Sequence, residues 1–399
     1  MSLFGPFHGG HGGHGGHGGH GGHGGHGGHG GHGGHGGHGG GLPFYPVGGA
    51  LQSAAMALVH HAGTDDVTTD QITPLAPNAT AHMERWSPNV RAMLLQMEFL
   101  QGFNTSTNAA SRPKKGKPTS KPVKVTLSWQ GAEFGYLYPA SADTLAAQLP
   151  IVRAYADQRG DRTGEVLSQL DYFTDFYLTA LGISAGRAAH LIELILLTQL
   201  LSGLCSMPAK HMLACRRPDE LDSRIMSLIP SPSHGSLPSG HGTQAVAIAT
   251  VLNTLLTHAG LETADMRNRQ KLVLAQSHRI AVNRTVAGVH FPMDNWAGAV
   301  IGRAVGEIIV AMGIGTTRTI PVLQADPNAP NAQAADFALA DLKLLFDNPD
   351  AKPLVGVQEV PARGGKGDVQ AVDLGGQSDL FAWLWGKALE DIQHVTGRS

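Results

Sequence analysis

The stretch AHLIELILLTQLLSGLC, residues 189–205, is the most apolar run of the chain. It contains His190, Glu193 and Gln199, whereas a helix that crosses a bilayer needs about 20 apolar residues with few or no charges. We therefore expect a helix buried in a protein core. The N-terminus MSLFGPFHGG has neither the basic start nor the apolar centre of a secretory signal. These two features predict a cytoplasmic chain with no membrane span.

The composition narrows the class of protein further. Hydrophobic residues make up 42% of the 399 residues and charged residues 15%, which is enough apolar material for a large core. The net charge is −2 with histidine neutral, so nothing in the overall charge predicts a nucleic-acid partner. Cys205 and Cys215 are the two cysteines and lie among apolar residues, which excludes a disulfide framework and fits a reducing compartment.

Apolar residues recur at helical spacing through most of the chain, which predicts an all-α helical bundle. KVTLSWQ (124–130) is the one convincing strand, and a hairpin with FGYLYP is left open. The sequence predicts a low-complexity tail at 1–41, a helical catalytic domain at 42–319 and a C-terminal linker with short helices at 320–399. Helices are expected at 84–103, 141–158, 164–182, 186–204, 243–258, 265–288, 294–313, 334–346 and 378–394.

Residues 8–41 repeat the triplet His-Gly-Gly. Glycine at two of every three positions cannot pack a core and predicts a flexible tail. Neutral imidazole suits zinc, nickel and copper, so loose binding of a divalent metal is one hypothesis for this tract. The alternative is a disordered tail with no dedicated role, which the lack of a preformed site favours.

Three segments later in the chain carry residues suited to binding an anion. They are KHMLACRRP (210–218), SLPSGHGTQA (236–245) and NRTVAGVHFPMD (283–294). In the first, Lys210 and Arg217 are seven apart, which on a helix would place both on one face with an anion between them. Guanidinium and ammonium groups both bind tetrahedral oxyanions.

The second segment predicts a loop that enters a helix. The Ser239 hydroxyl and the Gly240 amide would donate to an anion at the helix N-terminus, where the dipole also favours negative charge. His241 would stand at the entrance to this helix, placed for proton transfer. In the third segment, Asp294 follows His290 by four residues and can accept from its imidazole. That bond would fix the tautomer and leave the other nitrogen free as a nucleophile or metal ligand.

Taken together, the segments resemble the superfamily that joins the vanadium haloperoxidases to the type 2 phosphatidic acid phosphatases. Its pattern is Lys-x6-Arg-Pro, then Pro-Ser-Gly-His, then Ser-Arg-x5-His-x3-Asp, and this chain departs from it only at Asn283. The resemblance implies that His290 binds vanadium or attacks phosphorus and that His241 is the acid–base group. It also implies a set of residues that hold the anion's oxygens, namely Lys210, Arg217, Ser239, Gly240 and Arg284.

The same pocket serves two reactions within that superfamily. A haloperoxidase is favoured by the long helical N-terminal half and by the missing signal peptide. It is also favoured by His234, which stands at a place where algal bromoperoxidases carry a second histidine. Such an enzyme would use bound vanadate and hydrogen peroxide to oxidise halide. The short gap from His241 to Arg284, the ending HFPMDNWAG and Met207 in place of a tryptophan favour instead a phosphomonoesterase, or a phosphatidic acid phosphatase-like hydrolase, with a phosphohistidine at His290. The haloperoxidase is the main prediction, the hydrolase the alternative, and a non-catalytic oxyanion-binding protein the third hypothesis.

Overall fold

The computed structural model describes residues 57–58, 68–108, 123–347, 355–362 and 369–396. The chain divides into two compact units, one of Met1–Gly15 with Pro88–Ser399 and the other of Gly16–Ser87. In the smaller unit the described residues include two short 3-10 helices, Thr69–Gln71 and Thr80–Arg85. The His-Gly-Gly repeat lies outside the described residues, and the domain limits at 41 and 319 stay predictions.

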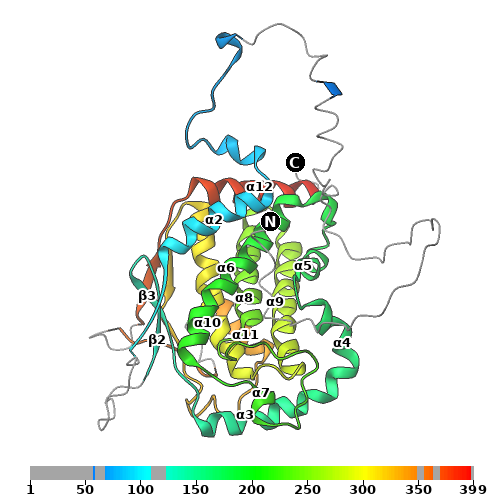
Figure 1. Cartoon of the computed structure of the whole chain (residues 1–399), viewed down its shortest axis with the longest axis vertical. Coiled ribbons are helices and arrows are strands. Elements are labelled where there is room, and N and C mark those ends of the chain that lie inside the picture. Colours follow the sequence, from blue (N-terminus) through cyan, green and yellow to red (C-terminus); the bar gives the residue numbers. More distant parts are fainter. Residues whose placement is uncertain (1–56, 59–67, 109–122, 348–354, 363–368, 397–399) are drawn as a thin grey trace, which may run out of the picture. The chain divides into compact units, whose positions relative to one another are not determined.

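Four long helices of the larger unit run side by side and form its centre (Figure 1). They are α6 (Ala189–Leu213), α8 (Gly240–His258), α9 (Thr263–Val286) and α10 (Pro292–Ile314). Almost every residue of α10 is buried, as expected for a helix that is apolar on all sides. The remaining helices are α2 (Pro88–Gly102), α3 (Ala142–Ala154), α4 (Arg159–Ser168), α5 (Thr174–Leu181), α7 (Pro218–Leu221), α11 (Leu339–Asp347) and α12 (Asp379–Val395).

Glycines bring α8 and α10 into backbone contact. A Cβ at Gly302 would lie 2.3 Å from the carbonyl oxygen of Thr243, and one at Gly298 would lie 2.7 Å from that of Ser239. No side chain larger than hydrogen fits at either position without moving one helix. The close approach lets the Ser239 amide donate to the carbonyl of Asp294 at 2.8 Å. This contact joins the second sequence motif directly to the third.

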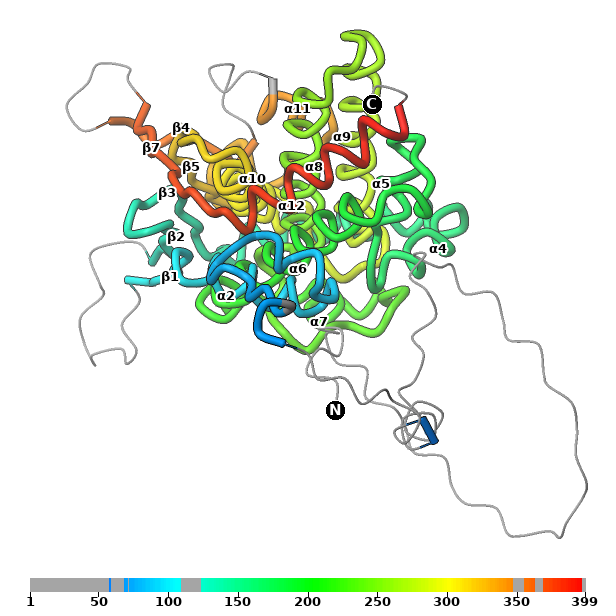
Figure 2. The backbone as a smooth tube through the Cα atoms, turned by 90° about the horizontal axis from the view of Figure 1, so that it is seen from above, coloured from blue at the N-terminus to red at the C-terminus, as the bar shows by residue number. Residues whose placement is uncertain are grey.

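A five-stranded sheet packs beside this helical centre, so the prediction of an all-α fold is only partly right. Its order is β1-β2-β3-β5-β6, with β3 and β5 parallel and the other neighbours antiparallel. The helices α6 and α10 both contact the sheet, and α12 crosses the ends of α6 and α8 (Figure 2). The strands are β1 (Phe103–Thr107), β2 (Val125–Trp129), β3 (Ala132–Leu137), β5 (Leu323–Ala325) and β6 (Val357–Glu359), and a separate two-stranded sheet joins β4 (Arg318–Pro321) to β7 (Ala371–Leu374).

The β2–β3 hairpin, which the sequence left open, is present, but the rest of the sheet was not predicted. The strands β5 and β6 have three residues each, too few to show an alternating pattern, and they form only because distant segments pair with them. The helices were predicted more accurately. The helix expected at 164–182 is split into α4 and α5, and α6 runs further than expected, through Pro208 to Leu213.

Two helices are long and apolar enough to cross a membrane, so the prediction of a cytoplasmic chain without a span is wrong. The segments are Ala189–Leu221 and Pro292–Ile314, with 61% and 89% of their apolar windows buried inside the structure. The prediction gave too much weight to Glu193. Its carboxylate accepts from Arg91 of α2 at 2.7 Å, so its charge is paired. The segment still contains an 18-residue window that is apolar enough for a span.

Candidate active site

Lys210 lies in the last turn of α6, which ends at Leu213. Ala214 follows with a φ of 47°, a left-handed conformation that terminates the helix, and its amide donates to the Lys210 carbonyl at 3.0 Å. The Lys210 ammonium donates to the carbonyls of Gly235 and Ser236, both at 3.1 Å, and to that of Pro238. All three of its N–H groups therefore hold the loop that precedes α8.

Arg217 is not on the same helix as Lys210, which corrects the prediction of a shared helical face. The chain turns at Ala214, and Arg217 is the N-cap residue of the short helix α7. The spacing of seven residues therefore has no helical meaning here. The two cations still come together through the loop, because Arg217 Nη2 lies 3.5 Å from the Gly235 carbonyl that also accepts from Lys210.

The Arg217 guanidinium is 1% exposed and links three parts of the site. Its Nε donates to the carbonyls of Pro232 at 3.0 Å and His234 at 3.1 Å. Its Nη1 donates to the Val289 carbonyl at 2.6 Å and lies 3.4 Å from His290 Nε2. A cation is therefore held directly against the outer nitrogen of His290.

His290 is held in one tautomer by Asp294. Its Nδ1 lies 2.9 Å from Asp294 Oδ2, and the same oxygen accepts from the Phe291 amide at 2.9 Å and from the Ser236 hydroxyl. A carboxylate oxygen can only accept, so Nδ1 carries the proton and Nε2 keeps its lone pair. Burial, with Arg217 and Lys210 next in effect, holds the pKa of His290 well below its usual value. The imidazole is therefore neutral, and Nε2 carries the lone pair that faces Arg217 Nη1.

Ser239, Gly240 and His241 form the N-terminus of α8. The Ser239 hydroxyl accepts from the Gly242 amide at 3.1 Å as the N-cap. The first amides of the helix, those of Gly240 and His241, have no acceptor within the helix itself. A Cβ at Gly240 would lie 3.9 Å from Lys210 Cε, which places this helix end beside the ammonium group. The position suits an anion.

His241 packs between α8 and the segment that joins α4 to α5. Its Nε2 lies 2.8 Å from the carbonyl of Gln169, and its ring centroid is 5.7 Å from that of Phe173. Because a carbonyl only accepts, Nε2 carries the proton and Nδ1 is the atom left to hold or move one. Burial, followed by the charge of Arg284, lowers the pKa of His241 to about 3. His241 is neutral in the absence of a bound anion.

Arg284 is the least satisfied group of the site. It is 1% exposed on α9, and its Nη2 donates to the Val166 carbonyl at 3.0 Å and to Gln169 Oε1 at 3.3 Å. Its Nε and Nη1 are buried with no partner among the residues that the structure describes. Burial lowers its pKa only to about 10, so the group stays charged at neutral pH. A buried guanidinium with two unpaired donors calls for an acceptor of negative charge.

Lys210, Arg217 and Arg284, here called the cationic cluster, are all buried and surround two neutral histidines. Asp294 is the carboxylate that the structure brings to His290. Lys210, Arg217 and His241 all act on the pKa of His290, and Arg284 acts on that of His241. The arrangement matches an oxyanion with several oxygens, which the cluster would neutralise and His290 would contact.

The family model described as the PAP2 superfamily matches residues 189–316. This segment is similar to the PAP2 superfamily. It runs from the start of α6 to just beyond α10 and contains all three motifs. Among solved structures, the chain is similar to the first transmembrane PAP2 type phosphatidylglycerolphosphate phosphatase from Bacillus subtilis, at 19% identity and a TM-score of 0.34 over 42% of this chain and 84% of that chain. No curated protein matches the chain.

Two residues beside the PAP2 motifs also contact the site; the sequence predicted one of them and missed the other. His234 was expected near the site, and its Nδ1 accepts from Arg217 Nη2 at 3.2 Å. Burial, then Lys210, lowers its pKa to about 4; its role stays a prediction. Gln169 was missed, although it contacts both His241 and Arg284. It lies before the PAP2 segment in a break between helices, and no motif or spacing marks it.

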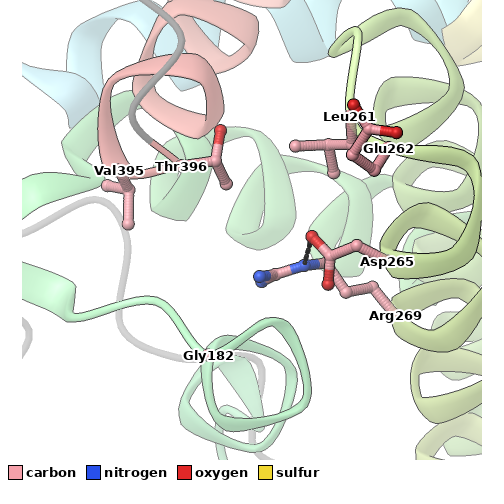
Figure 3. Close-up of a pocket in the computed structure, with 7 residues that line it drawn as sticks. All are labelled: Gly182, Leu261, Glu262, Asp265, Arg269, Val395 and Thr396. Atoms are coloured by element: carbon pink, nitrogen blue, oxygen red, sulfur yellow. Dashed lines mark hydrogen bonds and ion pairs between the residues drawn. The ribbon is translucent and has the colours of Figure 1, made fainter.

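The structure also has a pocket of about 370 Å³ that none of the PAP2 motif residues lines. It is bounded by the end of α5, the start of α9 and the end of α12 (Figure 3). Asp265 and Arg269 face into it and pair with each other at 3.0 Å, so its charges are largely satisfied. The pocket contains none of the residues of the cationic cluster and neither His241 nor His290, so it is not the candidate active site.

Proposed function

We propose that this chain is a phosphatase-type hydrolase that cleaves a phosphomonoester through a phosphohistidine at His290. One observation carries the proposal. A buried guanidinium, Arg284, has two unpaired N–H donors in a site that also holds a neutral histidine with a free Nε2. The PAP2 match supports the hydrolase alternative of the sequence analysis over the haloperoxidase.

Binding would begin with the phosphoryl oxygens. Arg284 Nε and Nη1, the Ser239 hydroxyl and the first amides of α8 are the donors available to them. Lys210 and Arg217 would add charge at short range while continuing to hold the 232–238 loop. Because these groups are fixed by the fold before the ester arrives, they need little reorganisation to stabilise the transition state.

Two transfers would complete the reaction. His290 Nε2 attacks phosphorus, the bond to the leaving oxygen breaks, and His241 gives that oxygen a proton. Asp294 offsets the positive charge that develops on the His290 ring. Water then attacks the phosphohistidine, His241 takes its proton, and the nitrogen–phosphorus bond breaks to release inorganic phosphate. The low pKa of His241 in the free site is raised when a phosphate dianion binds beside it, which lets it serve as the acid.

Vanadate stays part of the proposal in two distinct ways. The donors that fit phosphate also fit vanadate, so vanadate should inhibit hydrolysis as a phosphate analogue. In the competing hypothesis, His290 would hold vanadate as a cofactor that activates hydrogen peroxide for halide oxidation. The two hypotheses share the residues of the site and differ in the reaction, so an assay separates them.

The test runs two reactions on one preparation of the full-length chain, in detergent if it fractionates with membranes. We expect hydrolysis of p-nitrophenyl phosphate without added vanadate, and inhibition of that hydrolysis by orthovanadate. Bromination in vanadate and hydrogen peroxide should stay at the level of the His290→Ala variant. Vanadate-dependent bromination without phosphatase activity would replace the hydrolase with the haloperoxidase, and binding of vanadate without either turnover would leave a non-catalytic oxyanion-binding protein.

A further inference from the structure

Gln169 is fully buried and makes contacts with two separate parts of the candidate active site. It follows α4, at the C-cap position, and its backbone carbonyl accepts from His241 Nε2 at 2.8 Å. Its side-chain oxygen accepts from Arg284 Nη2 at 3.3 Å. One residue therefore fixes the tautomer of the histidine and touches the cation that has unpaired donors.

The side chain of Gln169 is itself held on both sides. Its Oε1 also accepts from Asn283 Nδ2 at 3.0 Å, and its Nε2 donates to Glu165 Oε1 at 3.1 Å. Asn283 in turn accepts from Arg162 Nη1 at 3.1 Å. The amide can therefore point its oxygen only toward α9, because Glu165 requires the nitrogen on the other side.

The departure from the superfamily pattern occurs at the residue that meets Gln169. The pattern has serine before the arginine of the third motif, and this chain has Asn283. A serine hydroxyl is shorter than an asparagine amide, whose nitrogen makes the 3.0 Å bond to Gln169. Gln169 and Asn283 thus form a matched pair, although Gln169 precedes the matched segment by twenty residues.

We propose that Gln169 is a positioning residue for the reaction: its side chain aims Arg284 at the bound oxyanion while its backbone carbonyl aims His241 at the leaving oxygen. The inference rests on the proposed function of the site. Arg284 Nη2 is anchored by Gln169 and by Val166, and this leaves Nε and Nη1 as the two donors for the anion. Without the Gln169 anchor the guanidinium can rotate about its remaining bond, and anion affinity falls.

The experiment compares Gln169→Leu with the parent chain, using p-nitrophenyl phosphate as substrate and orthovanadate as the competing anion. Leucine keeps the volume and the backbone carbonyl but removes the bonds to Arg284 and Asn283. We expect KM and the inhibition constant of orthovanadate to rise about tenfold, the usual effect of one hydrogen bond to a charged group. The kcat should change less, because the bond from His241 to the backbone carbonyl remains.

Gln169→Glu should make the inhibition constant of orthovanadate depend on pH, which would not happen if Gln169 had a purely structural role. At pH 8 the new carboxylate would pair with Arg284 and repel the anion, so the inhibition constant should rise about a hundredfold over the parent. Once the pH is low enough to protonate the carboxyl group, below its ordinary pKa of about 4.3, the group resembles the amide in shape, and the ratio of variant to parent should fall back to a few-fold. The charged or titratable groups around this position are Glu165, Arg162, Arg279, Arg284 and His241.

Gln148→Leu is the matched control. Gln148 is also a fully buried glutamine, but its side chain donates to the carbonyls of Ala332, Gln333 and Ala335 and accepts from the Met293 amide at 3.3 Å, and none of these bonds goes to a residue of the cationic cluster. Its replacement should lower the melting temperature about as much as Gln169→Leu does, while the inhibition constant of orthovanadate stays within twofold of the parent. Asn283→Ser should raise that constant about threefold, with no further effect in combination with Gln169→Leu.

The outcomes separate this inference from the proposed function. A parent that hydrolyses the ester and binds vanadate, with Gln169→Leu unchanged in both, overturns the inference alone. If Gln169→Leu does not fold, a pH-independent inhibition constant for Gln169→Glu equal to that of the parent overturns it instead. A parent that neither hydrolyses the ester nor binds vanadate overturns the proposed function and this inference together.

Discussion

The four long helices and the five-stranded sheet both have buried side chains, yet they differ in what they bury. The helices bury the charged side chains of Lys210, Arg284 and Asp294, and the loop between α6 and α7 adds that of Arg217. The described strands bury mainly apolar ones, such as Leu127, Trp129 and Phe134. A buried charge costs free energy unless it is paired, so its presence marks the part of the fold that has a chemical task. We therefore expect the sheet to stabilise that part without contributing to its chemistry.

The largest expected effect is at His290. Replacing it with alanine removes the proposed nucleophile, the His290 Nε2 that lies 3.4 Å from Arg217 Nη1, so hydrolysis of p-nitrophenyl phosphate should fall to the background rate. Tight binding of vanadate, followed by calorimetry, should be lost as well. Retention of parent-like vanadate affinity by His290→Ala would mean that the anion binds elsewhere.

His241→Ala should have a smaller effect than His290→Ala, because the proposed role of His241 is proton transfer rather than bonding to phosphorus. His241→Ala should lower kcat by roughly 10²–10⁴-fold, the usual range for one acid–base group. Much of the vanadate affinity should remain, since the three cations of the cluster are intact. Calorimetry on both histidine variants checks this contrast; weaker vanadate binding by His241→Ala than by His290→Ala would show that the two roles are reversed.

In the sheet, a change should affect stability and leave chemistry intact. Trp129 is 2% exposed, donates from its indole nitrogen to the Gly375 carbonyl at 2.8 Å, and lies 5.1 Å from Phe99 between ring centroids. Trp129→Ala should lower the free energy of unfolding by about 3–5 kcal/mol. The kcat of the folded fraction should equal that of the parent, with the exposed Leu272→Ala as control. A large fall in kcat would mean that the sheet shapes the site.

Within the helical region, the contact of α8 with α10 can be tested by substituting a glycine. Gly302→Ala places a methyl group 2.3 Å from the Thr243 carbonyl and should cost about 1–3 kcal/mol of stability. Gly386→Ala on α12, where nothing lies within 4 Å, should stabilise the fold by about 0.5–1 kcal/mol. Urea unfolding measures the stability of both variants. If Gly302→Ala were no less stable than Gly386→Ala, the two helices would not meet as closely as described.

The last expected effect is that of pH on the free energy of unfolding. His241 has a folded pKa of about 3 and an unfolded pKa near 6.5, so its contribution to stability is complete above pH 6.5. As the pH falls below 6.5 the unfolded chain binds a proton that the folded chain excludes, and stability falls by about 1.4 kcal/mol per pH unit. His241→Gln should flatten the slope of unfolding free energy against pH between 6 and 4. An unchanged slope would mean that His241 is accessible to protons in the fold.

The sequence predicted those parts of the site that depend on short spacings. The bond from His290 to Asp294 was predicted from their spacing of four residues. The N-terminus of α8 was predicted from Ser239 and Gly240. The prediction that Lys210 and Arg217 share a helical face was wrong, because Ala214 adopts a left-handed conformation that ends the helix and that no sequence pattern indicates. Gln169 could not be predicted either, since it stands 72 residues before His241 and its contacts exist only after folding.

The two unpaired donors of Arg284 have a consequence for how the protein is handled in the laboratory. A group that is buried without a partner weakens the fold until a ligand supplies the missing acceptor. Any oxyanion that binds there stabilises the folded chain by mass action, in proportion to the logarithm of its concentration over its dissociation constant. Phosphate or sulfate in a purification buffer would therefore raise the melting temperature while occupying the site, so the buffer that best preserves the protein would be the one in which its activity is hardest to detect.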